Sequence, residues 1–189
     1  DRLQPVEVGW GVATAPDQIN NRRWFIKPEA MTANPFGRTD DLVRMNPPRG
    51  TGLLIRPAGP VDPDVTFLSV RSPDGAAISL LANYGLHYVG GIAPGQLSAD
   101  YFGAFARQIG TRLNGGKNFV GIMSNGASGD VNNYDFLNPR PRAAPYERME
   151  SVAEIVANRV HDIHGSVRFT SEAVLRASER KITLGVRKP

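Results

Sequence analysis

The sequence of 189 residues contains no cysteine. This absence excludes disulfide bonds, thiolate zinc sites and cysteine nucleophiles, but it does not identify a compartment, because a secreted enzyme need not carry disulfides. Long hydrophobic runs are also missing, and the longest apolar stretches, such as Ile78–Ala82 and Phe119–Met123, are far too short to span a bilayer. No apolar leader follows a basic N-terminus, so we expect no signal peptide in this sequence, as in a mature or truncated secreted protein.

Charge of one sign is only in small excess, with 22 lysines and arginines against 18 acidic residues, a net charge of +4. The basic residues are scattered, for example at Arg22–Arg23, Arg140 and Arg142, and aromatic residues do not alternate with them. We therefore expect no nucleic-acid partner. The apolar content of 41% is that of a globular chain, and residues 1–189 suit a single domain or a fragment of one larger catalytic domain.

The periodicity of apolar residues predicts a layered fold of the α/β class, with α+β as a possibility. Strands are predicted at 6–12, 65–70 and 77–84, and the turn 72–75 joins the last two into a hairpin. A helix is predicted from an N-cap at Ser98 to Asn114–Gly116, then a short buried strand at 118–123 and a helix from Pro145 to Gly165. A last extended segment is predicted at 175–186. We expect a mixed β-sheet with flanking helices.

Residues 28–63 are rich in proline and glycine and lack a clear period. A connection between structural elements is usually much shorter. We therefore predict a long irregular loop here, with a functional loop or lid as one interpretation.

Two places in the sequence could carry chemistry. His87 follows the apolar strand 77–84 and leads into a glycine-rich loop, a position that suits a metal ligand or a base, although a hydrogen-bonded structural histidine is the alternative. The polar turn 124–130 follows the next predicted strand; there, Asn125 could donate to an oxyanion, and Asp130 could bind a metal or orient a histidine. Alternatively, these side chains only satisfy backbone groups of the turn.

Three sequence blocks, in this order, resemble the N-terminal catalytic domain of the neutral/alkaline non-lysosomal ceramidases. Asn83–His87 is similar to the family's Asn-Trp-Phe-…-His loop, Leu97–Tyr101 resembles its "(I/L)S(G/A)D" start of a helix, and Asn125–Val131 resembles its "GD(V/M)" turn. The early segment Val8–Arg22 resembles a strand followed by an "xINR" stretch in that family. The likeness covers about residues 5 to 165.

The resemblance implies a zinc-dependent hydrolase of amide (N-acyl) bonds, with a layered catalytic domain of which this chain is an internal part. It implies His87 as one zinc ligand. The family's other ligands come from an upstream His-x-His segment and from a downstream glutamate and tyrosine, which are not recognisable in this sequence. Because a catalytic zinc normally takes three protein ligands, we expect the remaining ligands of the single zinc ion to lie outside this chain.

One position departs from the family pattern. The ceramidases carry "GD-x-Ser-Pro-Asn", in which the serine is taken as the nucleophile, whereas Asn132 stands at that place here. Asparagine cannot attack a carbonyl group. The resemblance therefore marks Asn125, Asp130 and Asn132 as the catalytic-site candidates, and it supports amide hydrolysis more strongly than ceramide as the substrate.

Further candidates are weaker. Arg22, Tyr88 and Asp100 are candidate substrate-binding residues, although a surface arginine, a packed aromatic ring and a helix-capping acid are the alternatives. His161 and His164 share one face of a predicted helix and could bind a metal, or could simply sit in its last turn, where the helix dipole favours them.

Two functions remain open at this stage: the hydrolase, and a non-catalytic relative that binds a lipid or a glycan on the same scaffold. The expected partner is a small-molecule or lipid substrate, and a substrate at a membrane surface is one option. By resemblance alone, the protein is expected to be secreted or extracytoplasmic.

Overall fold

The computed structural model describes residues 3–186. Its main sheet has four strands in the order β1-β6-β7-β8, namely β1 (Glu7–Thr14), β6 (Asp64–Arg71), β7 (Ala77–Tyr84) and β8 (Val120–Asn125). The β1–β6 and β6–β7 pairs are antiparallel, whereas β7 and β8 are parallel and are connected through helix α1 (Asp100–Arg112). The predicted hairpin is confirmed, and its turn closes with a hydrogen bond from Gly75 N to Ser72 O of 2.9 Å.

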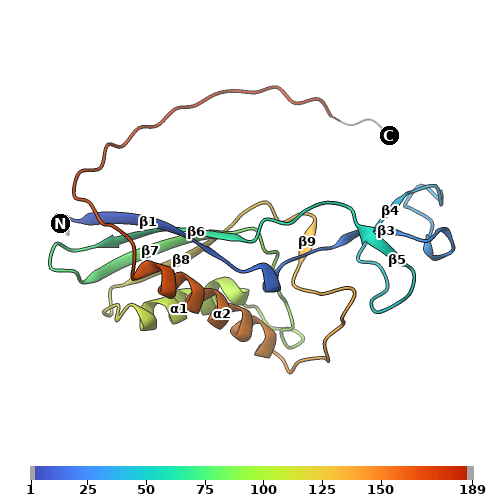
Figure 1. The fold of residues 1–189 in the computed structure, drawn as a ribbon, viewed down its shortest axis with the longest axis horizontal. Coiled ribbons are helices and arrows are strands. Elements are labelled where there is room, and N and C mark those ends of the chain that lie inside the picture. The colour runs from blue at the N-terminus through green and yellow to red at the C-terminus, as the bar shows by residue number, and fades with distance from the viewer. Residues whose placement is uncertain (1–2, 187–189) are drawn as a thin grey trace.

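Helix α1 and helix α2 (Glu147–His164) pack against each other on the same face of the main sheet (Figure 1). This confirms the predicted layered fold with a mixed sheet and helices. Because both helices cover one face and leave the other uncovered, the arrangement is α+β rather than doubly wound α/β. No helix within residues 3–186 is long and apolar enough to cross a membrane.

The core lies between the sheet and the two helices. Alternate residues of the strands point into it, including Val65, Phe67, Leu80, Ala82 and Tyr84, and the helices add Phe105, Ile109, Val152, Val156 and Val160. Helix α1 approaches β8 closely at Gly121, where an added Cβ would lie 2.6 Å from the carbonyl oxygen of Ala106. Burial of these apolar side chains is the main stabilising contribution to the fold.

The opposite face of the main sheet carries exposed apolar side chains. One row of directly paired residues crosses all four strands: Trp10, Leu68, Leu81 and Ile122. Each of these side chains is at least 41% exposed. The neighbouring rows, Val8–Val70–Ser79–Val120 and Val12–Thr66–Asn83–Ser124, contain no charged residue either. The prediction of a buried strand at 118–123 was therefore wrong in part, because β8 is an edge strand buried on one face only.

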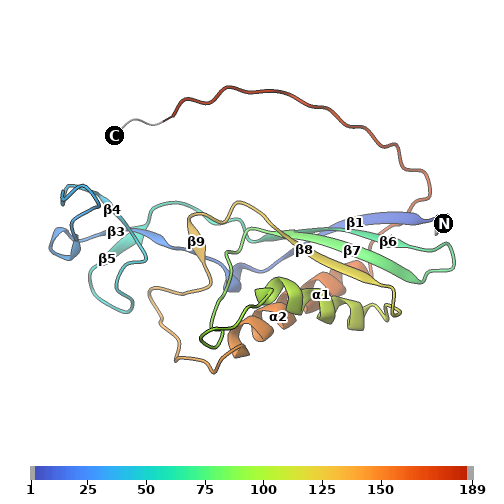
Figure 2. The ribbon, with the colours of Figure 1, turned by 180° about the vertical axis from the view of Figure 1, so that it is seen from behind.

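A second, smaller unit lies at the far end of the molecule from the N-terminus (Figure 2). Its sheet has the order β4-β3-β5, formed by β3 (Arg23–Ile26), β4 (Val43–Met45) and β5 (Leu54–Pro57). Trp24, Ile26 and Phe136 form its separate core. The predicted loop 28–63 is thus not irregular throughout: besides β4 and β5 it contains the short 3-10 helix Pro28–Ala30. Pairing with β3, which precedes the loop, creates strands that local periodicity does not reveal.

Two short elements connect the main sheet to the smaller unit. After the 3-10 helix Pro16–Gln18, strand β2 (Asn20–Asn21) pairs antiparallel with β9 (Val131–Asn132). This pairing brings the beginning of the chain beside the turn that follows β8. It lies between the two larger sheets in Figure 1.

Two further predictions need correction. Helix α1 begins at Asp100 with Ala99 as its N-cap, so Ser98 is not the cap; its Oγ instead accepts a hydrogen bond from Asp100 N at 3.0 Å. The segment predicted at 175–186 is extended, but residues 171–186 form no strand. The chain makes one antiparallel bridge between Val8 and Thr170 and then leaves the body of the molecule (Figure 1).

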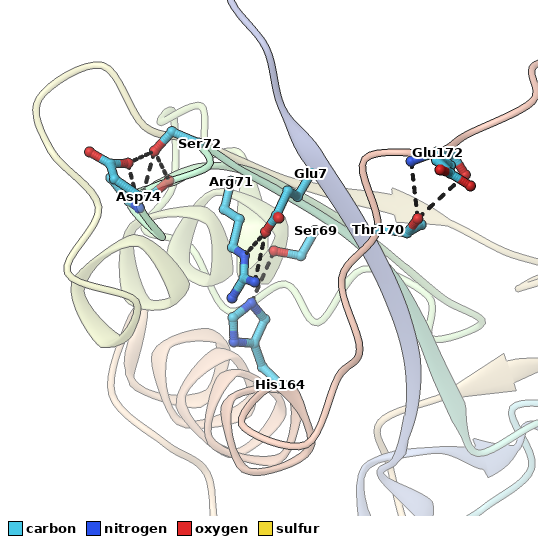
Figure 3. A network of polar contacts seen from close by, with 9 residues as sticks. Glu7, Ser69, Arg71, Ser72, Asp74, His164, Thr170 and Glu172 are labelled. Atoms are coloured by element: carbon cyan, nitrogen blue, oxygen red, sulfur yellow. Dashed lines mark hydrogen bonds and ion pairs between the residues drawn. The ribbon is translucent and has the colours of Figure 1, made fainter.

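Polar contacts fix the end of α2 to the sheet near this bridge (Figure 3). His164 Nε2 lies 3.0 Å from Ser69 Oγ, and Arg71 forms an ion pair of 2.7 Å with Glu7 across β1 and β6. His161, by contrast, is exposed. The two histidines therefore face different surroundings, and within residues 3–186 they belong to no group of three metal-ligating side chains.

Candidate functional site

The two segments that were predicted to carry chemistry, the loop with His87 and the turn 124–130, start at the same edge of the main sheet. Strands β7 and β8 are parallel neighbours, with Tyr84 opposite Asn125, so their carboxyl ends lie side by side. The loops that follow are in contact, since a Cβ on Gly126 would lie 3.2 Å from Gly85 Cα. The edge at the carboxyl ends of parallel strands is where open sheets commonly bind ligands.

The loop that carries His87 is held by hydrogen bonds from the starts of both helices. The buried hydroxyl of Tyr101 donates to Leu86 O at 2.9 Å, and Tyr146 N donates to Gly91 O at 2.9 Å. Burial raises the pKa of Tyr101 far above its usual value, so its hydroxyl stays protonated and remains a donor. Both anchors fix the backbone around His87, which is the requirement for a positioned ligand.

The imidazole of His87 is half-buried, and its ring centroid lies 4.1 Å from that of Tyr88. The role of His87, as a metal ligand, a base or a structural residue, stays a prediction. Tyr88 is 62% exposed. Its ring is therefore accessible to solvent, and its substrate-binding role stays a prediction.

Asp100 braces the same loop through its carboxylate. Oδ1 accepts from Val89 N at 2.8 Å and from Tyr101 N at 2.7 Å, and Oδ2 accepts from Gly90 N at 2.7 Å. The residue has a φ of +54°, a left-handed conformation that aspartate tolerates better than most side chains. Both oxygens of the predicted substrate-binding residue are thus engaged by the backbone of the protein itself.

The turn after β8 is fixed by its own side chains and by Arg22. Asn125 Nδ2 donates to Ser128 Oγ at 3.0 Å. Arg22 donates to Gly129 O from Nη2 at 2.8 Å, and its backbone N–H donates to Asp130 O at 2.8 Å. The guanidinium of Arg22 therefore positions the turn, and its role toward a substrate stays a prediction. The carboxylate of Asp130 is exposed.

Asn132 has an unusual environment. It lies in β9 opposite Asn20, and its side-chain oxygen is buried without a hydrogen-bond partner within the described chain. A buried amide oxygen normally has a partner, and leaving it without one costs about 1–3 kcal/mol. Asn132 also lines a cleft of about 540 Å³ together with Arg44, Arg49 and Tyr134. A donor on a ligand or a water molecule would satisfy this oxygen.

The residues do not supply a complete metal site. Nowhere in residues 3–186 do three or more histidine, aspartate or glutamate side chains come close enough together to hold a metal ion. His87 could contribute one ligand, and the expectation that the remaining ligands lie outside this chain stays a prediction. The chain as described therefore does not fit a catalytic zinc ion by itself.

A second and larger cleft, which sequence reasoning missed, lies beside the His87 loop. It measures about 660 Å³ and is lined by Val89, Gly90 and Gly91 on one side and by residues of the segment 133–148 on the other. Four arginines line it: Arg49, Arg140, Arg142 and Arg148. They are separated by as many as 99 positions in the sequence, so they look like scattered surface charges there, and no local pattern groups them.

Comparison with solved structures finds ceramidases. A ceramidase complexed with C2 superposes with a TM-score of 0.59 at 16% sequence identity, and a neutral ceramidase from Pseudomonas aeruginosa superposes with a TM-score of 0.55 at 17% identity. Each comparison covers 87% of this chain but only 23% of the ceramidase chain. At this identity the likeness shows a ceramidase-like fold. No protein-family model and no curated protein sequence matches the chain.

Proposed function

We propose that this chain is part of a ceramidase-like, zinc-dependent hydrolase that cleaves N-acyl amide bonds. The observation that carries the proposal is the contact between the loop that carries His87 and the turn that follows β8, at the carboxyl ends of β7 and β8, in a fold similar to part of two ceramidases. The chain spans 23% of the length of those ceramidases, so the activity would belong to a larger catalytic unit.

Within that unit, the residues of this chain would bind and orient the substrate. Asn132 offers a buried oxygen without a partner, which can accept a hydrogen bond from the N–H of an amide substrate. Asp100 and Tyr101 would hold the His87 loop in place. His87 would supply one zinc ligand, while the other ligands would come from outside the described residues. Asn132 cannot act as a nucleophile, so the attacking group would not come from its position.

Zinc content tests the assignment of His87. We expect about one zinc ion per chain in the natural protein and loss of that zinc in the His87→Ala variant, measured by elemental analysis. His161→Ala is the matched control, because His161 is exposed and lies in the last turn of α2 rather than in the loop after β7. Retained stoichiometric zinc in His87→Ala would overturn the assignment, as would a parent protein without zinc.

A second candidate function is a non-catalytic relative that binds a lipid or a glycan. The observation that favours it is Asn132 at the place of the family's serine. It predicts binding without turnover. Release of a fluorescent amine from an N-acyl substrate, abolished by a chelator, would exclude this candidate and support the hydrolase.

The partners and the location follow from the same proposal. We infer a small-molecule or lipid substrate, which could be taken from a membrane surface, and a secreted or extracytoplasmic protein. A nucleic-acid partner is not part of the proposal, since the basic residues form no stripe interleaved with aromatic side chains.

A further inference from the structure

We propose that the arginine-lined cleft beside the His87 loop binds the oxyanion of a small ligand, either a carboxylate or a phosphate. The cleft is the space of about 660 Å³ between residues 89–91 and the segment 133–148. The inference deepens the proposed function, because it implies that the amide substrate carries an acidic group. It rests on the proposed function only for the identity of that ligand. The binding itself can be measured without any turnover.

The first argument is the charge of the lining. Arg49, Arg140, Arg142 and Arg148 face one acidic residue, Asp135. Among residues 3–186, the four arginines that form ion pairs with carboxylates are Arg38, Arg71, Arg107 and Arg159, and none of these lines the cleft. Four guanidinium groups that share a concave surface with a single carboxylate leave an excess of positive charge, and an anion in the cleft would be attracted to it.

Asp135 offsets only one of the four positive charges, and the oxygens of its carboxylate are engaged locally. It accepts hydrogen bonds from Leu137 N at 2.9 Å, from Asn138 N at 3.0 Å and from Asn138 Nδ2 at 3.0 Å. Burial works to raise the pKa of Asp135, but the hydrogen bonds from Asn138 and Leu137, with the charge of Arg140, outweigh it and leave the pKa below its usual value. The aspartate stays ionised and shapes the 135–138 turn.

Two of the arginines are fixed in place before any ligand binds. Arg148 Nε donates to Asn133 Oδ1 at 2.6 Å, and Arg148 Nη2 donates to Gln18 Oε1 at 3.4 Å. Both acceptor residues are buried. The guanidinium of Arg49 lies over the ring of Tyr134, 4.5 Å from its centroid. Fixed donors lose less conformational entropy when a ligand binds, so they favour binding of a planar or tetrahedral oxyanion.

The cleft is a neighbour of the cleft that Asn132 lines. Arg49 and Tyr134 line both this cleft and the neighbouring one of about 540 Å³, in which Asn132 lies. A ligand whose acidic group contacts the arginines can therefore extend toward the unpartnered oxygen of Asn132. This arrangement suits an N-acyl amide that bears a carboxylate or phosphate group, such as an N-acyl amino acid.

The test is calorimetric titration of the purified chain at low ionic strength with three probes: N-hexanoylglycine, its neutral isostere N-hexanoylglycinamide, and inorganic phosphate. We expect N-hexanoylglycine or phosphate to bind, and the neutral amide to bind at least tenfold more weakly. Binding of the glycine conjugate assigns the site to carboxylates, and binding of phosphate alone assigns it to phosphates. No binding of either anion, or equal binding of the neutral amide, would overturn the proposal.

A pair of double variants removes the same charge from two places. Arg140→Gln/Arg142→Gln should weaken anion binding at least tenfold, whereas Arg176→Gln/Arg180→Gln, in the exposed extended segment, should change it less than twofold. If circular dichroism shows that Arg140→Gln/Arg142→Gln fails to fold, the single variant Arg142→Gln replaces it. The single variant should weaken anion binding severalfold. Equal losses in both pairs would overturn the proposal. Anion binding without amide turnover would overturn only the hydrolase function, so the two failures remain distinguishable.

Discussion

The carboxylate of Asp100 accepts the backbone N–H of Gly90 at 2.7 Å and so ties the first residue of α1 to the loop after β7. The same carboxylate accepts from Val89 N at 2.8 Å. A charged acceptor shared by consecutive backbone amides makes stronger hydrogen bonds than a neutral one. The ceramidase-like segments around His87 and Asp100 are thus joined in space by a specific contact.

Replacing Asp100 with asparagine should destabilise the protein. The amide keeps one acceptor oxygen but turns an NH₂ group toward a backbone N–H, and the left-handed backbone conformation remains acceptable to asparagine. We expect the free energy of unfolding to fall by about 1–3 kcal/mol, measured by urea denaturation. Asp130→Asn, at an exposed carboxylate, is the matched control and should stay within about 0.5 kcal/mol of the parent. Equal effects of the two variants would contradict the bracing role of Asp100.

Tyr101→Phe should weaken the anchor on the other side of His87. The variant removes the hydroxyl that donates to Leu86 O and leaves that buried carbonyl without this donor. The expected loss is about 1–2 kcal/mol in the free energy of unfolding. Tyr88→Phe removes a hydroxyl from a tyrosine that is 62% exposed and should have almost no effect. A stability of Tyr101→Phe equal to that of the parent would show that this hydrogen bond contributes nothing.

Gly121→Ala tests the close approach of α1 to β8. The added methyl group would meet the carbonyl oxygen of Ala106 at 2.6 Å, so the helix has to move away from the strand. We expect a loss of about 1–3 kcal/mol in thermal or urea unfolding. Gly116→Ala adds the same methyl group where no atom lies within 4 Å, and it should be neutral. Equal stability of the two variants would contradict the close approach of α1 to β8 at Gly121.

Stability should decrease in mild acid because of His164. Burial lowers the pKa of this histidine below its usual 6.5, and the charges of His161 and Arg71 lower it further. The unfolded chain therefore binds a proton in a pH range where the folded chain does not. The free energy of unfolding falls as the pH drops through about 6.5, and above that value the contribution of His164 is constant.

The measurement is the urea midpoint of the parent and of His164→Gln between pH 5 and pH 8. Glutamine keeps a polar group near Ser69 Oγ but cannot take up a proton in this range. We expect the pH dependence of the parent to exceed that of the variant over the acidic half of this interval. Parallel curves would show that other groups, and not His164, cause the acid sensitivity.

Much of the main unit could be predicted because its signals are local. The hairpin of β6 and β7 follows from two runs rich in apolar residues on either side of a Ser-Pro-Asp-Gly turn, and α2 follows from its apolar stripe and Gly165. The positions of His87 and Asn125 at strand ends were predictable for the same reason. The sequence could not reveal that β8 is an edge strand, because burial of Val120 and Ile122 depends on what lies beside and above the strand.

Other features depend on pairing between distant segments. Strands β4 and β5 exist because β3 lies between them, and β9 exists because it meets β2, about 110 positions earlier. Trp10 shows the same limit. The alternation of side chains along β1 places Trp10 on one face of the strand. Only the register Trp10–Leu68–Leu81–Ile122 extends that position into an apolar row across the sheet.

The sequence by itself determined the strands of the main sheet, the two helices, the absence of thiol chemistry and the ceramidase-like order of three short motifs, since each of these is carried by neighbouring residues. Tertiary structure alone decided which groups share a site. The bracing of the His87 loop by Asp100, the unpartnered oxygen of Asn132 and the gathering of Arg49 with Arg140, Arg142 and Arg148 all arise from contacts between segments far apart along the chain. Local side-chain patterns do not indicate such contacts, because these contacts form only when distant segments pack together.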